Sequence, residues 1–389
     1  MKLNTRRLRG LVLAAVLALV AVAAGRVAFW EPLPLVGEEP GDRYARAAGV
    51  VHVHTTLSDG GGTPEEVIAA ARTAGLDFVG ITDHNNVDAK PFEGLHEGVL
   101  VLVGSEISTQ KGHLVGLGLS EDPAYRFSRS GLEDLEDVRD LGGFSAAAHP
   151  FSARPDLRWT GWDLPGPWGI ELINVDSEWR QAGPRALFGA TLYALNSQWA
   201  LLQGLNAPDE ALKRWDEMLK ERDVVGHYGA DAHARLSLTD SWGLRFPSYE
   251  ALFSLVKTHV VLDRPLSGNE DADRDAVLEA LRRGRSYIGL DALAPADGFS
   301  FTVSGGGGEH WTMGERVPFR QGLHARAGGR VPAGARVLLF RDGSLLGQAR
   351  ESLEAPVPGP GVYRAEVRVT DLPVPWVIAY PFSVFDEAS

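Results

Sequence analysis

The chain has 389 residues, of which 44% are hydrophobic and 23% are charged. This composition excludes a mainly disordered protein and is enough for one large domain and a smaller one. The formal net charge of −13 at pH 7 repels a phosphate backbone, so no nucleic-acid partner is expected. Because cysteine is absent, any metal must be held by histidine, aspartate and glutamate.

The N-terminus has the pattern of an export signal or a short membrane anchor. Basic residues up to Arg9 precede an uncharged run from Gly10 to Gly25, and Ala21-Val22-Ala23 offers a small-residue cleavage site. We predict a signal peptide or membrane anchor over residues 1–26 and a Pro- and Gly-rich linker over 27–48. Because a basic flank stays in the cytoplasm, the remainder is expected outside it: periplasmic, secreted or anchored to the membrane.

From Gly49 to about Leu290, short apolar runs alternate with helical patterns, which is typical of βα units around a parallel sheet or barrel. The predicted strands cover residues 50–54, 78–82, 99–105, 113–119, 144–148, 170–174, 224–229 and 260–262. The predicted helices cover 63–74, 132–141, 185–202, 208–222 and 271–283. The first helix has the clearest signal, with Thr63 as N-cap, Pro64 at the first helical position and Glu66 completing a capping box.

Two further segments complete the predicted organisation. Residues from about 153 to 223 are longer than a barrel connection requires, so we interpret them as an insertion that roofs the site. After Asp291 the pattern changes to alternating runs such as FSFTV and YRAEVRV, separated by Gly and Pro turns. This predicts a C-terminal antiparallel β domain, similar to a sandwich, over 297–389.

Side chains that can bind metals follow successive predicted strands. His52 and His54 stand two residues apart at a strand end, Asp59 follows on a Ser-Asp-Gly turn, and His84 and Glu106 follow the next two strands. An isolated His-x-His pair is more often a packing feature, but active sites of barrels are built where strands end. The candidate ligands are His52, His54, Asp59, His84, Glu106, His113, His149, Asp231 and His233. Such a mixed set suits two or three ions of zinc, manganese or iron, and Asp83 is expected to support a neighbouring ligand instead of binding metal itself.

Five segments resemble the motifs of the PHP (polymerase and histidinol phosphatase) superfamily, in the usual order. They are HVHTTLSDG (52–60), ITDH (81–84), GSEIST with GH (104–109 and 112–113), AHP (148–150) and GADAH (229–233). The resemblance covers residues 49–290 and implies a distorted (β/α)7 barrel, a three-metal site and phosphoester hydrolysis. Asp59 stands where some histidinol-phosphatase-like members have histidine, which favours the branch that acts on small phosphoesters and nucleotides.

The expected reaction is hydrolysis of a small phosphoester by a metal-bound hydroxide, because adjacent metals lower the pKa of a bridging water. Glu106 is the predicted bridging carboxylate, and Asp59 and His233 join it in the catalytic set. His52, His54 and Asp231 are expected to complete one metal site. Arg154 and Arg235 are predicted to bind substrate oxyanions, although most loop arginines of this kind are simply solvated.

Two alternative functions stay open at this point. An amidohydrolase-type enzyme also uses histidines at barrel ends, commonly with two metals and sometimes with a modified lysine. A non-catalytic binding protein with a relic barrel is the other, although an intact set of nine ligands argues against it. The sequence leaves the oligomeric state open.

Overall fold

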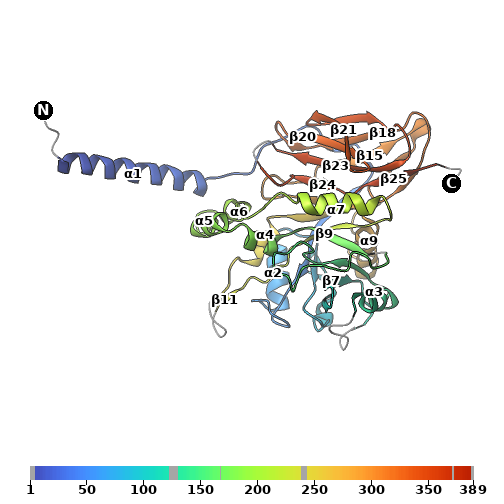
Figure 1. Cartoon of the computed structure of the whole chain (residues 1–389), viewed down its shortest axis with the longest axis horizontal. Coiled ribbons are helices and arrows are strands. Elements are labelled where there is room, and N and C mark those ends of the chain that lie inside the picture. Colours follow the sequence, from blue (N-terminus) through green and yellow to red (C-terminus); the bar gives the residue numbers. More distant parts are fainter. Residues whose placement is uncertain (1–4, 122–129, 167, 238–242, 370–371, 387–389) are drawn as a thin grey trace.

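The computed structural model describes residues 5–121, 130–166, 168–237, 243–369 and 372–386. Helix α1 (Thr5–Ala28) projects from a body in which the C-terminal strands lie on one side and the α/β part on the other (Figure 1). The other helices of the described part are α2 (Pro64–Thr73), α3 (Gly131–Asp140), α4 (Val175–Gln181), α5 (Pro184–Leu192), α6 (Ser197–Leu202), α7 (Asp209–Leu219), α8 (Tyr249–Phe253), α9 (Glu270–Arg283) and the 3₁₀ turns η1 (Lys90–Phe92) and η2 (Gly306–Gly308).

Two sheets carry the α/β part. One has five strands in the order β10-β9-β8-β7-β6. Its strands are β6 (Ser105–Thr109), β7 (Gly112–Leu117), β8 (Phe144–Ala147), β9 (Gly169–Asn174) and β10 (Gly226–Gly229). The other follows the path β17-β25-β23-β24-β14-β13-β2-β3-β5-β4, with β20 and β21 attached. Its strands are β2 (Ala45–Val53), β3 (Phe78–Ile81), β4 (Gly94–His96), β5 (Val99–Val103), β13 (Lys257–Leu262), β14 (Ser286–Gly289), β17 (Arg316–Pro318), β20 (Arg336–Arg341), β21 (Ser344–Arg350), β23 (Gly361–Arg368), β24 (Val377–Ala379) and β25 (Phe382–Phe385).

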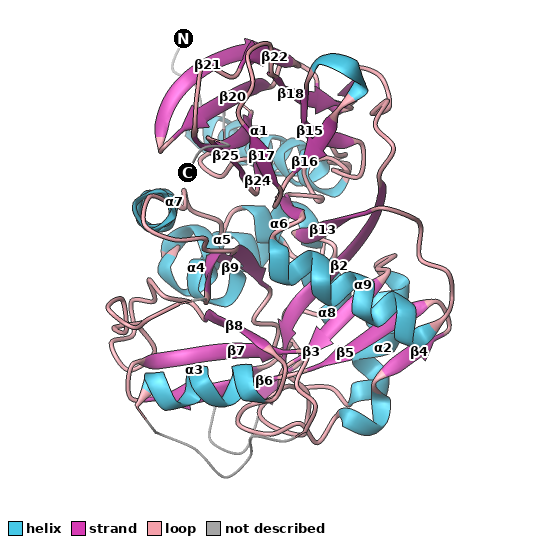
Figure 2. Ribbon diagram, turned by 90° about the vertical axis from the view of Figure 1, so that its right-hand side faces the viewer, coloured by secondary structure: helices cyan, strands magenta, loops and turns pink. Residues whose placement is uncertain are grey.

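The mixed α/β class is confirmed, but the (β/α)7 barrel is not: the described strands form no closed barrel. Isolated parallel bridges connect the two sheets: Val53, at the end of β2, pairs with Ala232, just after β10, and His84, just after β3, pairs with Glu106 in β6. On the other side of β2, strand β13 pairs antiparallel and continues the sheet toward the C-terminal strands. Helix α9 packs over β13, β5 and β4, and α3 packs over β6, β7 and β8 (Figure 2).

The C-terminal part is rich in strands and is continuous with the large sheet, because β24 pairs with β14. A separate four-stranded sheet has the order β16-β15-β18-β22, formed by β15 (Phe299–Ser304), β16 (His310–Thr312), β18 (His324–Gly329) and β22 (Leu353–Pro356). Two small pairings are β1 (Leu35–Val36) with β19 (Val331–Pro332) and β11 (Leu236–Ser237) with β12 (Gly243–Leu244). Trp376 is fully buried and donates a hydrogen bond to the Ala294 carbonyl, so apolar packing crosses the predicted boundary near residue 297. That boundary stays a prediction.

Local sequence accounts for several helix ends. The capping box at Thr63 and Glu66 is present, which confirms the start predicted for α2. The single helix predicted over 185–202 is wrong: the chain forms α5 and α6 instead. Asn196 is extended and its side chain accepts a hydrogen bond from the Trp199 N–H, so it caps a new helix and interrupts the old one.

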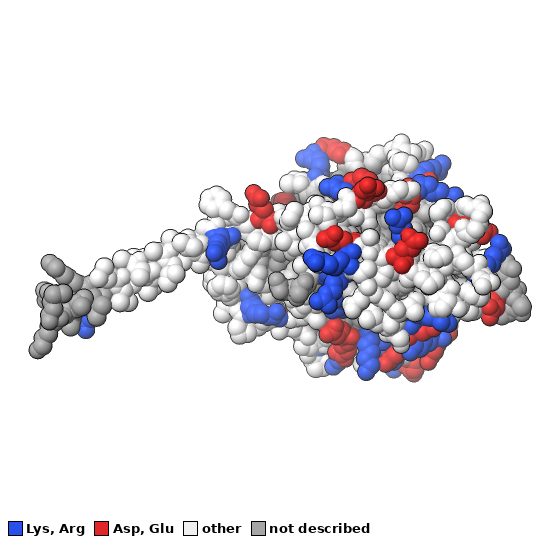
Figure 3. All heavy atoms as spheres, turned by 90° about the horizontal axis from the view of Figure 1, so that it is seen from above, with Lys and Arg blue, Asp and Glu red and all other residues white. Residues whose placement is uncertain are grey.

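The N-terminal segment is helical and then follows the body closely. Within α1, Leu11–Ala28 is long and apolar enough to cross a membrane, a property that a signal sequence shares. Residues of the predicted linker over 27–48 contact the body: the Leu33 N–H donates to the Leu293 carbonyl, and β1 pairs with β19. In Figure 3 the apolar stretch of α1 is white between basic residues near its two ends, whereas charged residues are interspersed over the body.

Candidate metal centre

Irregular backbone at strand ends aims the candidate ligands. The pairing of β2 with β3 shifts register between Val50 and Val53, and His52 in that interval has a φ of 67°. His149 and Asp231, which follow β8 and β10, have φ values of 30° and 48°. Non-glycine residues rarely adopt positive φ, and such backbone persists where the surroundings hold it, typically at functional sites. The sequence pattern assumed that side chains of β2 alternate regularly between the two faces of the strand. The irregular backbone at His52 breaks that alternation.

Glu106, on β6, lies at the centre of the histidine cluster. Its Oε1 is 2.7 Å from His113 Nδ1 and 2.9 Å from His149 Nε2. Its Oε2 is 3.1 Å from both His52 Nε2 and His54 Nε2, and 3.3 Å from His84 Nδ1. One carboxylate thus touches side chains from five different positions of the chain, as expected of a bridging group.

The first ligand group consists of His52, His54, Glu106 and Asp231, whose candidate ligand atoms lie within 4.8 Å of one another. All four side chains are buried. His52 Nε2, His54 Nε2 and Glu106 Oε2 have no hydrogen-bond partner among the described residues. Buried polar atoms without partners are costly, so a cation among them would satisfy all three at once. The donor set therefore fits a divalent metal.

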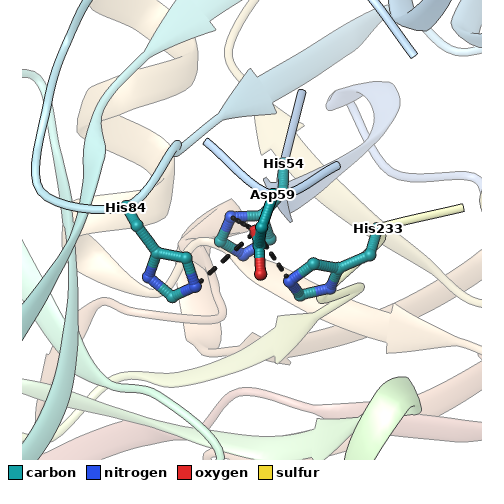
Figure 4. Close-up of side chains that lie close together, drawn as sticks. All are labelled: His54, Asp59, His84 and His233. Carbon is teal, nitrogen blue, oxygen red and sulfur yellow. Dashed lines mark ion pairs between the residues drawn. The ribbon is translucent and has the colours of Figure 1, made fainter. Parts of the chain in front are cut away.

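The second group consists of His54, Asp59, His84 and His233, and Figure 4 shows the Asp59 carboxylate pointing between the three imidazoles. Asp59 Oδ1 is 3.2 Å from His233 Nε2, 3.7 Å from His54 Nδ1 and 3.8 Å from His84 Nε2. Burial alone raises the pKa of Asp59, but the hydrogen bond and charge of His233 outweigh it and lower the pKa to about 2. Conversely, burial lowers the pKa of His233, but the Asp59 contact raises it to about 9. A third group joins His84, Glu106 and His113.

The electrostatic balance of the cluster favours added positive charge. Burial by itself raises the pKa of Glu106, but the charge of His52 and hydrogen bonds from His113 and His149 hold that pKa well below its ordinary value. The same competition lowers the pKa of Asp231, chiefly through the charge of His52. The carboxylates are thus ionised and attract cations, which either protonated imidazoles or divalent metals can supply.

Glu171 is a site residue that the sequence analysis missed. It is buried on β9, and its Oε1 lies 2.6 Å from His52 Nδ1. Its Oε2 accepts hydrogen bonds from the His149 N–H at 2.7 Å and from Asn174 Nδ2 at 2.9 Å. A side chain on Gly229 would collide with the Glu171 carboxylate, so glycine is needed there. The available signal was an acidic residue inside the apolar run Ile170-Glu171-Leu172-Ile173.

Asp83 supports the turn that carries Asp59. Its carboxylate accepts hydrogen bonds from the Thr55 N–H and hydroxyl, both at 2.7 Å, and from the Ser58 hydroxyl at 2.5 Å. It belongs to none of the ligand groups found among the described residues. This placement agrees with its predicted supporting role.

A pocket of about 360 Å³ opens over the cluster. It is lined by Asp59, His84, Glu106, His113, His149, Arg154, Leu157, Asp176, Arg180, Asp231, His233 and Arg235. The two arginines predicted to bind substrate are thus present in the wall, and the completely buried His52 and His54 are not. Arg180 and Asp176, which form an ion pair of 2.5 Å on α4, were not predicted. They come from the segment interpreted as an insertion.

Known proteins resemble part of the chain in sequence or in fold. The PHP domain model matches residues 51–142. An uncharacterized protein of Methanocaldococcus jannaschii is 34% identical over an alignment of 117 residues that covers 26% of this chain and 67% of that protein. A two-domain protein of Bacteroides vulgatus that contains a predicted PHP-like metal-dependent phosphoesterase is 16% identical, with coverage of 91% of this chain and 98% of that structure and a TM-score of 0.40. An amidohydrolase of Chromobacterium violaceum is 15% identical, with coverage of 53% and 96% and a TM-score of 0.31. At these TM-scores, neither structure bears on the reaction of this chain.

Proposed function

The chain belongs to the PHP superfamily, and on that premise we propose that it hydrolyses phosphoesters with two or three divalent metal ions held by the His/Asp/Glu cluster. The family and the ligand groups support a metal-dependent hydrolase in general. The phosphoester as substrate, zinc, manganese or iron as the metal, and a location outside the cytoplasmic membrane are parts of the proposal. The location is supported by the apolar helix α1 near the N-terminus.

The observation that carries the proposal is the position of Glu106. Its two oxygens lie within 3.3 Å of nitrogen atoms from five histidines, in a buried cluster that also contains Asp231. Divalent cations packed closely together repel strongly, and a carboxylate between them offsets that repulsion. A packing role alone would not require five imidazole nitrogens around one anion, with His52 Nε2 and His54 Nε2 left without a hydrogen-bond partner.

We assign the roles of the ligand residues by how deeply each side chain is buried. Bound metals supply Lewis acidity toward the phosphoryl oxygens and the attacking water. His52, His54 and Asp231 would hold one ion beneath the pocket, with Glu106 shared between ions. Asp59, whose side chain is 52% exposed, and His233, at 20%, would hold a second ion and face the substrate.

The arginines at the pocket wall favour an anionic substrate. Arg154, Arg180 and Arg235 line the pocket together, and guanidinium groups bind phosphate oxygens with charge-assisted hydrogen bonds. Among the described lining residues there is no lysine to serve as the modified ligand of some amidohydrolases. Both features support a phosphoester over an amide, with small phosphomonoesters, phosphodiesters and nucleotides as candidates.

Removal and return of metal tests this function. The full chain, treated with a chelator and then supplied separately with Zn²⁺, Mn²⁺ and Fe²⁺, is assayed with p-nitrophenyl phosphate, bis(p-nitrophenyl) phosphate and a p-nitroanilide. We expect chelation to abolish phosphoester turnover and at least one metal to restore it, because the attacking water needs Lewis-acid activation. Faster turnover of the anilide would instead favour an amidohydrolase, and no turnover by the metal-loaded chain would favour a binding protein.

A further inference from the structure

Helices α5 and α6 form a hairpin with exposed apolar side chains, and beyond Arg185 at its start the hairpin carries no charge. Residues 186–208 contain no Asp, Glu, Lys or Arg, although 23% of the whole chain is charged. Leu187 is 70% exposed, Phe188 57% and Leu195 44%. Single exposed apolar residues are ordinary on protein surfaces, but several within one stretch without charged residues indicate a contact surface.

This hairpin lies at the base of α1. Figure 1 shows α5 and α6 at the end of the body from which α1 projects. Asn196, between the two helices, donates a hydrogen bond from Nδ2 to the Trp30 carbonyl at 3.3 Å. Trp30 follows the last residue of α1 by only two positions, so the hairpin is tied to the end of that helix.

The length of α1 fixes where a membrane would end. The apolar window Leu11–Ala28 has 18 residues. At a rise of 1.5 Å per residue it extends about 27 Å, close to the ~30 Å hydrocarbon core of a bilayer. The whole window is therefore needed to cross, yet Val27 is already buried against the body, at 7% exposure. The bilayer boundary consequently falls at the body surface, beside Phe29, which is 86% exposed.

We propose that Leu187, Phe188, Leu195 and Phe29 form a membrane-contact patch whose apolar side chains enter the lipid interface next to α1. The occupant is a lipid surface, because Phe29 directly follows α1 and Leu195 adjoins the hairpin's contact with the end of that helix, where the bilayer boundary falls. The absence of charged residues from 186–208 and the net charge of −13 favour insertion of apolar side chains over attraction to anionic lipids. Helix α4, which supplies Asp176 and Arg180 to the pocket, ends shortly before α5, so the patch also links the pocket wall to the membrane face.

Site-specific labelling tests the patch without depending on catalysis. The chain has no cysteine, so Leu187→Cys and Leu195→Cys each provide a single site for the fluorophore NBD. Leu345→Cys on β21 is the matched control, because Leu345 is 51% exposed and lies in the C-terminal part of the chain. The full chain is placed in phosphatidylcholine vesicles with and without spin-labelled lipid.

We expect the spin-labelled lipid to quench most of the fluorescence at positions 187 and 195 and little at 345. Unquenched, water-like emission at 187 and 195 would overturn the proposal, because the patch would then face solvent. Blue-shifted emission that lipid does not quench would also overturn it, because a protein surface such as a second copy would then cover the patch. Neither outcome bears on phosphoesterase activity, which the chelation experiment measures separately.

Discussion

Replacing Glu106 by glutamine should remove at least one metal ion and lower phosphoester turnover by more than about 100-fold, because a lost ligand costs more than a lost outer partner, which typically costs ~10–100-fold. The change keeps the size of the side chain but removes the negative charge from the centre of five histidines. Without that charge, neighbouring cations repel each other with less compensation. Metal content by mass spectrometry and turnover of a p-nitrophenyl phosphoester are the readouts.

The matched control is Glu354→Gln, the same chemical change at an exposed position on β22. It should alter neither metal content nor rate. A thermal unfolding curve of Glu106→Gln in the presence of metal separates loss of the site from loss of the fold. Full metal occupancy and a normal rate in Glu106→Gln would rule out the bridging role.

Replacing Glu171 by glutamine should weaken metal binding by about 10–100-fold while leaving the nine candidate ligands in place. The Glu171 carboxylate accepts from His52 Nδ1, which leaves His52 Nε2 as the free lone pair toward Glu106 and Asp231. A glutamine amide group turned toward His52 would donate to Nδ1 and move the ring proton to Nε2. The opposite orientation would place that amide against the donors of His149 and Asn174. In either orientation the glutamine loses at least one of the hydrogen bonds that the Glu171 carboxylate accepts from His52, His149 and Asn174.

Metal titration monitored by calorimetry measures this effect, and Glu354→Gln again serves as the control. Metal-loaded Glu171→Gln should bind metal more weakly than the unchanged chain but unfold at the same midpoint temperature. If Glu171→Gln lowers the midpoint but binds metal as tightly as the unchanged chain, Glu171 has a purely structural role. The two readouts therefore separate orientation of His52 from packing of β9.

The positions of many candidate ligands follow from the sequence, because they stand at or just after the end of a short apolar run. His84 and Glu106, for example, follow β3 and β5 closely, and the structure bridges them. The capping box of α2 is equally local, since Thr63 and Glu66 are three residues apart. Features that depend on neighbouring residues in the chain are thus accessible to pattern analysis.

Features that depend on distant segments were not predicted. Glu171 is 119 positions from its partner His52, and an acidic residue within an apolar strand does not reveal which imidazole it meets. Strand β6 also escaped prediction, because its pairing with β7 comes from a hairpin inside a stretch expected to be a connection. Likewise, the join between β14 and β24 links segments about ninety residues apart, and no alternation pattern specifies that partner.

In the proposed site, Glu106 lies between two or three divalent metal ions. Crystals of the full chain loaded with Mn²⁺ or Zn²⁺, with anomalous diffraction measured at the absorption edge of the metal, test it directly. We expect at least two anomalous peaks among the donors of the ligand groups, each within ordinary bonding distance of a Glu106 oxygen. A metal-loaded crystal with no peak at Glu106, or with a single ion bound away from it, would contradict the bridging role of Glu106.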